Sequence, residues 1–325
     1  MKILVLRFSS IGDIVLTTPI VRQLKTQLSG AKVHYATKPA YRSLLEANPY
    51  VDKIHVLSGS LGELVAELRA EQFDFIVDLH GSLRSRLIRM RMPSVLSCSF
   101  NKLNFRKWLL VKTKINRLPP IHIVDRYREA AAPLNIQDDG GGLDYFIPAG
   151  QDVDVAATLP HGFRAGRYVA VAIGAQHATK RLPVEKLIDL MGQLAPTPIV
   201  LLGGPEDEST GHIIEIAVRD KQLLYNGCGQ FTLHQSASLV RQADYIVTHD
   251  TGLMHIAAAF SKPIVSIWGN TVPAFGMYPY RTRFQTLEVQ GLSCRPCSKI
   301  GFAKCPQGHF KCMRDQDLRL LAPPE

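Results

Sequence analysis

A polar turn late in the chain carries residue types that bind phosphate. Asp250, Thr251 and Gly252 follow the apolar stretch 245–248 after one intervening residue, and His255 comes one helical turn later. Aspartate and threonine are good helix N-cap residues, glycine lets the backbone approach a ligand closely, and the free N–H groups at a helix N-terminus favour an anion. The spacing therefore predicts a metal-free pyrophosphate cradle between a strand and a helix. The alternative is an ordinary capped turn.

Two more loops in the same half of the chain follow apolar stretches and carry charges. One contains Lys180 and Arg181, either of which could neutralise a diphosphate leaving group as its charge develops. The other contains Glu206 and Asp207, and a carboxylate in this position can bind a ribose 2′-hydroxyl. Either loop alone is typical of a surface turn, but three such loops at successive strand ends favour a nucleotide. The motifs G-x-G-x-x-G and G-x-x-x-x-G-K-[ST] do not occur, which argues against dehydrogenases and phosphate-loop NTPases.

The beginning of the chain has a similar strand-to-helix turn with different chemistry. Apolar residues from 3 to 8 lead into Ser9-Ser10-Ile11-Gly12-Asp13, and a helical pattern starts at Ile14. A single glycine and a carboxylate fit a phosphate poorly, because the carboxylate would repel it. Asp13 is expected at a helix N-terminus, where the dipole favours its ionised form. This turn is therefore expected to present a negative charge, not to hold a phosphate.

Hydrophobic periodicity predicts an α/β protein in which strands alternate with crossover helices, which implies parallel sheets. The expected strands are 3–8, 32–37, 53–57, 74–79, 94–99, 168–173, 198–202, 245–248 and 263–268. The expected helices are 14–28, 40–47, 61–71, 83–91, 184–194, 209–219, 233–241 and 253–260. The Gly- and Pro-rich stretch 135–166 has the composition of a linker. We therefore expect two domains, 1–155 and 156–325, the second with a Cys-rich loop at 291–313 and a closing helix at 315–321.

Positive charge is concentrated in one segment. The formal net charge is +10, and no acidic residue occurs between Asp78 and Asp125. Phe100, Phe105 and Trp108 are interleaved with the cations of this segment. Such a stretch suits a polyanion, which could be nucleic acid, an anionic membrane surface or an acidic glycolipid; the alternative is a solvated basic face without a partner. The cations are Arg84, Arg86, Arg89, Arg91, Lys102, Arg106, Lys107, Lys112, Lys114 and Arg117.

Four of the six cysteines lie close together in the sequence, in the order Cys294, Cys297, Cys305 and Cys312, with His309 nearby. A C-x-x-C pair followed by two further thiols suits a structural zinc site that fastens the loop, and a set of reduced, buried cysteines is the alternative. Disulfides are less expected in a cytoplasmic protein. A cytoplasmic location is itself predicted, because no apolar run approaches the ~20 residues of a membrane span and the first residues are typical of a strand.

Two motifs in this order resemble a known family. R-x-S-x-x-G-D-x-V-x-x-T-P-x-x-R-x-L runs from Arg7 to Leu24, and D-T-G-x-x-H-x-A-A runs from Asp250 to Ala258. Together they are similar to the ADP-heptose:lipopolysaccharide heptosyltransferases of glycosyltransferase family nine, and the likeness extends over essentially the whole chain. The segment 78–85, D-L-H-G-S-L-R-S, is similar to a family segment that lines the acceptor side.

The resemblance implies a GT-B fold, in which two Rossmann-like domains face each other across a cleft. The N-terminal domain would bind a glycolipid acceptor and the C-terminal domain a nucleotide-sugar donor. Catalysis would be inverting and would need no metal or other cofactor, and Asp13 would be the general base that deprotonates the acceptor hydroxyl. The implied donor-binding residues are Lys180, Glu206, Asp207, Asp250, Thr251, Gly252 and His255. The implied acceptor-binding residues are Ser10, Gly12, His80 and Arg84.

Two departures from the family pattern lie around the nucleotide. Leu182 stands where the family often has tryptophan, and Gly269-Asn270-Thr271 stands where it often has Gly-Pro-Thr. These departures leave the base and the sugar of the donor open more than the type of reaction.

The leading hypothesis is transfer of a heptose or related sugar from an ADP-sugar to a lipopolysaccharide core or lipid A-linked acceptor. The partners would be the ADP-sugar, the anionic glycolipid and the cytoplasmic face of the inner membrane. The basic segment 84–117 would contact that membrane as part of a peripheral protein, and nucleic acid is not expected. One alternative is a relative that uses another nucleotide sugar. The other is a basic, zinc-stabilised nucleic-acid-binding protein, which would leave Asp13 and the 250–255 turn without a role.

Overall fold

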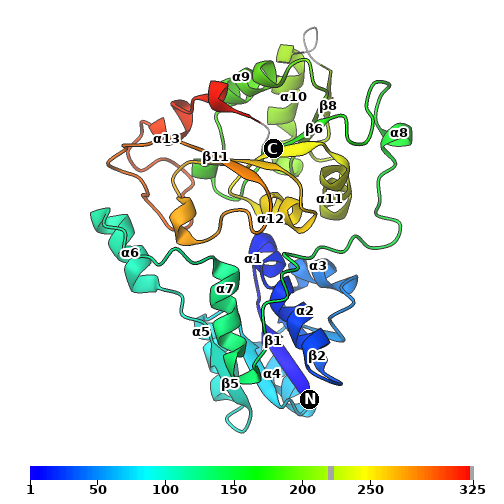
Figure 1. Ribbon diagram of the computed structural model, residues 1–325, viewed down its shortest axis with the longest axis vertical. Helices are drawn as coiled ribbons and strands as arrows, with labels where there is room; N and C mark the ends of the chain where they lie inside the picture. The colour runs from blue at the N-terminus through cyan, green and yellow to red at the C-terminus, as the bar shows by residue number, and fades with distance from the viewer. Residues whose placement is uncertain (219–222, 323–325) are drawn as a thin grey trace. The chain divides into compact units, whose positions relative to one another are not determined.

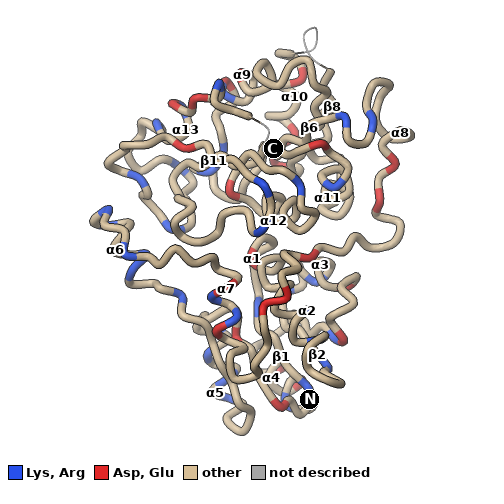
Figure 2. Tube along the Cα trace, in the orientation of Figure 1, with Lys and Arg blue, Asp and Glu red and all other residues tan. Residues whose placement is uncertain are grey.

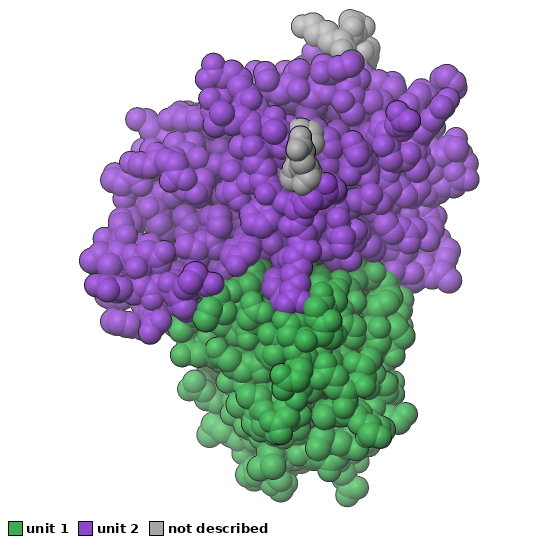
Figure 3. All heavy atoms as spheres, viewed as in Figure 1, with its two compact units in different colours: residues 1–103, 121–146 green, residues 104–120, 147–325 purple. Residues whose placement is uncertain are grey.

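The computed structural model describes residues 1–218 and 223–322, and the chain divides into two compact units. Unit 1 comprises residues 1–103 and 121–146 (Figure 3). Unit 2 comprises residues 104–120 and 147–325.

The domain border expected after residue 155 differs from this division, because contacts hold the linker at both of its ends. Arg22 of unit 1 forms ion pairs with Asp139 at 2.7 Å and with Asp144. Farther along the chain, the N–H group of Val153 donates to the hydroxyl of Ser238 in unit 2 at 3.0 Å. The segment 104–120 is a second difference, because it belongs to unit 2 although the residues before and after it belong to unit 1.

Unit 1 is built on a five-stranded parallel sheet with the order β3-β2-β1-β4-β5. Its strands are β1 (Lys2–Leu6), β2 (Lys32–Thr37), β3 (Lys53–Val56), β4 (Phe75–Asp78) and β5 (Leu96–Ser99), all close to their predicted bounds. Its helices are α1 (Ile11–Val15), α2 (Thr18–Gln27), α3 (Ser43–Glu46), α4 (Leu61–Ala70), α5 (Leu83–Met90) and α7 (Ile123–Arg128), with 3₁₀ turns η1 (Pro39–Tyr41) and η2 (Glu129–Leu134). Apolar side chains of α4 and α5 pack together with those of the sheet, and α2 contacts α7 and β2. Figure 1 labels these helices and strands.

The single helix expected at 14–28 is wrong, because the chain forms α1 and α2 with a break near Pro19. Proline has no N–H group, so it cannot donate to the carbonyl oxygen of Val15 one turn earlier. The hydroxyl of Thr18 donates to that oxygen instead, at 2.8 Å. As a result, α1 is a separate short helix, and it carries Asp13 in its first turn.

Unit 2 is built on a six-stranded parallel sheet with the order β11-β10-β9-β6-β7-β8. Its strands are β6 (Val169–Ala172), β7 (Ile199–Leu202), β8 (Leu224–Asn226), β9 (Tyr245–His249), β10 (Ile264–Trp268) and β11 (Phe284–Glu288), and the sequence pattern predicts neither β8 nor β11. Its helices are α6 (Asn104–Thr113), α8 (Val155–Thr158), α9 (Val184–Leu194), α10 (Glu208–Val218), α11 (Leu233–Gln242), α12 (Gly252–Ala259) and α13 (Lys311–Arg314). Its 3₁₀ turns are η3 (Ala178–Lys180), η4 (Pro205–Asp207), η5 (Pro273–Phe275) and η6 (Leu318–Leu320). The predicted end of α10 at residue 219 lies outside the described residues.

Both sheets have the same winding. The first strand of each sheet, β1 or β6, lies inside it, with the next two strands on one side and the later strands on the other. In this doubly wound Rossmann order, ligands bind beyond the carboxyl ends of the strands at the point where the order reverses. The reversal lies between β1 and β4 in unit 1 and between β6 and β9 in unit 2. The predicted α/β class with parallel sheets is therefore confirmed.

The closing helix expected at 315–321 is wrong, because that stretch contains only the 3₁₀ turn η6. The buried side chain of Gln316 donates to the carbonyl oxygens of Trp268 and Cys312, at 3.1 and 2.8 Å. Asp317 caps η6 by accepting from the backbone of that turn. Side chain–backbone bonds of this kind compete with helix formation.

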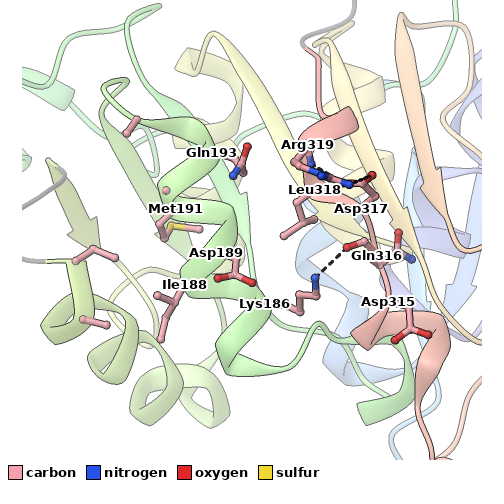
Figure 4. Close-up of a pocket in the computed structure, with 14 residues that line it drawn as sticks. Lys186, Ile188, Asp189, Met191, Gln193, Asp315, Gln316, Asp317, Leu318 and Arg319 are labelled. Carbon is pink, nitrogen blue, oxygen red and sulfur yellow. Dashed lines mark hydrogen bonds and ion pairs between the residues drawn. The ribbon is translucent and has the colours of Figure 1, made fainter.

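A surface pocket of about 830 Å³ lies between α9 and this C-terminal stretch (Figure 4). At its edge, Lys186 of α9 donates to the carbonyl oxygen of Gln316 at 3.0 Å. None of the residues predicted to bind a donor or an acceptor lines this pocket. It is a packing groove between a helix and the end of the described chain, so the candidate site has to be sought at the strand ends.

Candidate functional site

The predicted site residues gather at one sheet edge in each unit. In unit 1 they lie on the segments that follow β1 and β4, and in unit 2 on the segments that follow β6, β7 and β9. In both units, two of these segments flank the reversal of strand order. Parallel strands end at the same edge of a sheet, so side chains that are far apart in the sequence meet there.

Asp13 is held in place by hydrogen bonds and an ion pair. Its Oδ2 accepts from the N–H group of Ser10 at 3.3 Å and from the Ser10 hydroxyl at 3.0 Å. Its Oδ1 lies 2.7 Å from Nη2 of Arg7. Gly12 precedes it in α1 and is buried. The Asp13 side chain remains 23% exposed, so a ligand can reach the carboxylate.

Arg7 joins three elements around that carboxylate. Its buried guanidinium donates to the carbonyl oxygens of Ser9 and Leu79, each at 2.7 Å, and to the hydroxyl of Tyr127 at 3.1 Å. These contacts tie the ends of β1 and β4 to α7. The sequence suggests a helix dipole as the positive neighbour of Asp13, but α1 has only five residues. The full charge of Arg7 is the stronger influence on the carboxylate.

Phe8 brings two predicted acceptor-side residues next to this group. The ring of His80 packs edge-on against the Phe8 ring with centroids 5.7 Å apart, and the guanidinium of Arg84 lies 5.6 Å from the centroid of the same ring. Burial, together with the nearby Arg7 cation, lowers the pKa of His80 to about 4, so its imidazole is neutral at neutral pH. A neutral imidazole and a cation near a carboxylate suit an acceptor that carries both hydroxyl and anionic groups. The residues that unit 1 brings together are Ser10, Gly12, Asp13, His80 and Arg84.

In unit 2, Lys180 is paired with Asp250. The lysine Nζ lies 2.6 Å from Oδ2 of Asp250 and 3.3 Å from its carbonyl oxygen. The hydroxyl of Thr271 donates to the same Oδ2 at 3.0 Å. Asp250 therefore orients the lysine, and an anionic ligand would contact Lys180 and not the carboxylate.

The start of α12 lies beside this lysine. Thr251 is the N-cap residue and Gly252 the first residue of the eight-residue helix. The Thr251 hydroxyl lies 3.3 Å from the hydroxyl of Thr248 and, within the described residues, makes no capping bond to the helix. His255 is only 2% exposed and belongs to the buried side of α12. The positive end of the helix dipole and the lysine charge thus act on the same place.

The two acids that follow β7 differ in their surroundings. Asp207 is 3% exposed, lies 2.9 Å from Nη1 of Arg181 and accepts from the N–H group of Gly204 at 3.0 Å. Its carboxylate is therefore occupied in fastening the loops after β6 and β7 to each other. Glu206 is exposed, so it is the acid that a ribose can reach.

A family model and several known proteins are similar to most of this chain. A family model described as glycosyltransferase family 9 (heptosyltransferase) matches residues 61–305. The chain belongs to glycosyltransferase family 9. It is 26% identical to lipooligosaccharide heptosyltransferase 2 of Haemophilus influenzae over 297 residues, which cover 85% of each chain. It is also similar to two solved structures from Escherichia coli. ADP-heptose lipopolysaccharide heptosyltransferase II has a TM-score of 0.67 at 22% identity and covers 98% of this chain and 99% of that one. A heptosyltransferase solved with ADP has a TM-score of 0.64 at 20% identity, with 88% and 92% covered.

The predicted family and the predicted GT-B class are confirmed. Family 9 membership also favours a transferase over the nucleic-acid-binding alternative, which leaves the Asp13 turn and the start of α12 without a role.

In this family 9 glycosyltransferase, the Cys-rich segment fastens the loops that carry the donor-side residues. The backbone of Phe302 exchanges hydrogen bonds of 2.8 and 3.2 Å with Thr179, which directly precedes Lys180. Arg295 donates to the carbonyl oxygen of Thr271 at 2.9 Å. The segment therefore supports two of the residues that surround Asp250.

Among the described residues, no three of the four cysteines of this segment form a compact group of metal ligands. Burial raises the pKa of Cys312 to about 12, and the neighbouring thiols of Cys297 and Cys305 raise it further. Sγ of Cys294 lies 3.8 Å from Nε2 of His309. In the described parts of the chain, the group of three possible ligands that lie within 4.8 Å of one another is found elsewhere, in unit 1. Zinc at the cysteines stays a prediction.

The group in unit 1 consists of His34, His55 and Glu71. Nδ1 of His34 lies 3.0 Å from Nε2 of His55. Glu71 is already ion-paired with Lys2 at 2.9 Å and with Lys53. The first residues of β1 and β3 take part, so the group lies toward the amino ends of the strands, away from the candidate site. We interpret it as a polar network that fastens the end of α4 to the sheet.

Sequence reasoning missed Arg7, Thr271 and Arg295 as residues that build the site. A signal for Arg7 exists, because it is a charged residue that ends an apolar strand and opens the first motif. The other two carry no local signal. Their contact joins residues 24 positions apart and depends on how the Cys-rich segment folds back onto the sheet.

Arg7→Lys tests whether Arg7 positions Asp13. Lysine keeps the charge but loses the planar fork that reaches Ser9, Leu79 and Asp13 together. We expect kcat to fall about 10–100-fold with little change in the donor KM, because a displaced carboxylate slows the chemical step and unit 2 is untouched. Arg42→Lys, which alters an exposed ion pair in the same unit, is the control for steady-state kinetics and thermal melting. An unchanged kcat in a folded Arg7→Lys protein would contradict the positioning role.

Lys180→Met tests the donor side, with ADP affinity measured by calorimetry. Loss of a charge-assisted contact should raise the Kd of ADP about 10–100-fold. Part of this loss would come from the Asp250 carboxylate, which would lose its cation and keep only the Thr271 hydroxyl as a partner. The double variant Lys180→Met/Asp250→Asn should therefore bind ADP more tightly than Lys180→Met alone. Effects that simply add would show that Asp250 does not act through Lys180.

Proposed function

We propose that this protein transfers a heptose from ADP-heptose to the anionic core of lipopolysaccharide or a lipid A-linked precursor, with inversion at the anomeric carbon and without a catalytic metal ion. The observation that carries the proposal is that each unit holds a charged group at its own switch point. The β1/β4 edge holds a fixed carboxylate, and the β6/β9 edge holds a lysine and a helix N-terminus. The similar Haemophilus influenzae and Escherichia coli proteins are heptosyltransferases, and one was solved with ADP, which supports heptose and ADP as the parts of the donor.

In the proposed reaction, Asp13 accepts the proton of an acceptor hydroxyl. The hydroxyl oxygen forms a bond to the anomeric carbon from the side opposite the diphosphate. The bond between that carbon and the diphosphate oxygen breaks, and its electron pair leaves with ADP, so the configuration is inverted. The ion pair with Arg7 fixes the carboxylate in place, and correct positioning would supply much of the rate.

The protein itself supplies positive charge to the leaving group. Lys180 and the N–H groups at the start of α12 would stabilise the diphosphate as its charge develops. Glu206 would accept a hydrogen bond from the ribose. With these groups in place, the proposed displacement requires no divalent cation.

The proposed acceptor is an anionic glycolipid at the cytoplasmic face of the inner membrane. Arg84 and His80 near the catalytic carboxylate would bind its core sugars. The cations of the segment 84–117 are divided between the units, those up to Lys102 in unit 1 and those from Arg106 onward in unit 2 (Figure 2). Every helix of the described chain is too short or too polar to cross a bilayer. Membrane contact is therefore proposed to use surface cations.

We further propose a structural zinc ion on the four thiols of the Cys-rich segment, at Cys294, Cys297, Cys305 and Cys312. The support is the C-x-x-C pair followed by two further thiols in the sequence and the loops that this segment fastens. Protein purified without added metal should contain one zinc per chain. Removal of the metal by a chelator should lower the thermal midpoint and weaken ADP binding, because Thr179 and its loop lose their support. Metal-free protein with full ADP affinity would contradict the site and favour reduced cysteines.

Asp13→Asn tests the general base. Turnover should fall about 10²–10⁴-fold, because asparagine cannot take the proton, while the Kd of ADP stays near that of the unchanged protein. Product formation from ADP-heptose and ADP calorimetry measure the two effects. Asp74→Asn, an exposed carboxylate before β4, is the matched control and should leave both unchanged. Turnover near the original rate in Asp13→Asn would mean that another residue is the base.

The choice of donor is tested separately. ADP-heptose should give the highest kcat/KM among ADP-, UDP- and GDP-sugars offered with a core acceptor. A higher value with another nucleotide sugar would replace the donor but keep the transferase. If ADP and ADP-sugars gave no thermal shift while oligonucleotides bound tightly, the transferase proposal would fail in favour of nucleic acid binding.

A further inference from the structure

Helix α6 has one side that packs on the protein and another that carries exposed aromatic rings. On the inner side, Leu110 is 5% exposed, and Nζ of Lys114, just after the helix, donates to the carbonyl oxygens of Cys294 and Pro296 at 3.2 and 2.8 Å. On the outer side, Phe105 is 72% and Trp108 52% exposed. The helix is therefore fastened to the Cys-rich segment of unit 2 while its two large rings face solvent.

The two rings form a single apolar projection. Phe105 and Trp108 stack with centroids 5.9 Å apart and planes inclined by 24°. Leu109 adjoins them in the helix, and Ile115 beyond its end is 51% exposed. Scattered exposed apolar residues are normal, but a stacked pair with aliphatic neighbours on one short segment marks an interaction surface.

The charges around this projection have one sign. Residues 104–120 contain no acidic residue, and blue positions recur along α6 in Figure 2. Their cations are Arg106, Lys107, Lys112, Lys114 and Arg117. The occupant of this surface therefore has to combine negative charge with an apolar layer.

An anionic bilayer has both properties. Tryptophan and phenylalanine favour the boundary between headgroups and acyl chains, and lysine and arginine bind the headgroup phosphates. A nucleic-acid platform fits less well, because the two rings already stack on each other and their neighbours are aliphatic. A protein partner also fits less well, because lysine is depleted in such interfaces and supplies two of the four cations that remain besides the inward-bonded Lys114.

We propose that the outer side of α6 inserts Phe105 and Trp108 into the headgroup boundary of an anionic bilayer, with the cations of 104–120 other than the inward-bonded Lys114 on the lipid phosphates. This anchor belongs to unit 2, the unit that carries the donor-side residues. The anchor would supply the lipid contact of the proposed function. Its biological purpose rests on that function, but its existence does not, because vesicle binding is measured without donor or acceptor.

The intrinsic fluorescence of the protein tests the insertion directly. The chain has two tryptophans, and Trp268 is 1% exposed, so a change on adding vesicles reports Trp108. With phosphatidylcholine vesicles that contain about one third phosphatidylglycerol, the emission should shift to shorter wavelength and be quenched by brominated acyl chains. Pure phosphatidylcholine should give a much smaller response, and Trp108→Phe should give none.

The variant Phe105→Ser/Trp108→Ser keeps every cation and should bind the same anionic vesicles at least about 10-fold more weakly in flotation. Ile213→Ser/Ile216→Ser removes two exposed apolar residues from α10 in the same unit and is the matched control, with binding unchanged. Thermal melting and ADP binding establish that each variant is folded. Transfer to a deacylated, water-soluble acceptor should be unchanged in the α6 variant, whereas transfer to vesicle-embedded acceptor should fall.

Three results would overturn the proposal. One is an absence of Trp108 response to anionic vesicles, or equal vesicle binding by the α6 variant. Another is a Trp108 response to single-stranded oligonucleotides or to protein concentration in place of lipid, which would assign the surface to nucleic acid or to a second copy. The third is a matching loss in the α10 control. Failure of the proposed function is distinguishable, because it would abolish transfer to every acceptor and leave vesicle binding intact.

Discussion

The buried guanidinium of Arg7 constrains everything around it in unit 1. An arginine stays charged when it is buried, so the protein has to supply its hydrogen-bond acceptors. The carbonyl oxygens of Ser9 and Leu79 and the hydroxyl of Tyr127 supply three, and the carboxylate of Asp13 supplies the opposite charge. The ends of β1 and β4 and helix α7 must therefore keep a fixed spacing around one cation. The position of Asp13 follows from that requirement.

In unit 2 the charges of the ion pair have exchanged roles. There a carboxylate, Asp250, lies between Lys180 and the Thr271 hydroxyl, and the lysine is the member that can contact a ligand. Each unit thus has an ion pair at the reversal of its strand order, Arg7–Asp13 in unit 1 and Lys180–Asp250 in unit 2, in which one partner fixes the other. In the proposed reaction, the anion of unit 1 would take a proton from one substrate and the cation of unit 2 would receive the leaving group of the other.

The sequence allowed most strands to be predicted, and it placed the candidate site residues on the segments that follow them, where the structure has them. Parallel strands buried on both faces are continuous apolar runs, as in β1, β6 and β9. The strands β8 and β11 lack such runs, because they are only partly buried, and the break at Pro19 depended on a local competition for one carbonyl oxygen. The partners of the site residues could not be predicted, because Arg7 meets Leu79 and Tyr127 at separations of 72 and 120 residues. Those contacts depend on the order of the strands in the sheet, and the local sequence does not determine that order.

Because residues 104–120 belong to unit 2, the chain passes between the two units three times, after residues 103, 120 and 146. A gene fusion of two relatives joined only near residue 146 would therefore mix parents within unit 2. Its α6 would come from one parent and the carbonyl groups that receive Lys114 from the other. Replacement of the whole of unit 2 in this chain therefore requires two inserted pieces of coding sequence, one for 104–120 and one for the part after residue 146. Helix α6 lies in the first half of the sequence, but in the structure it belongs to unit 2 with the second half.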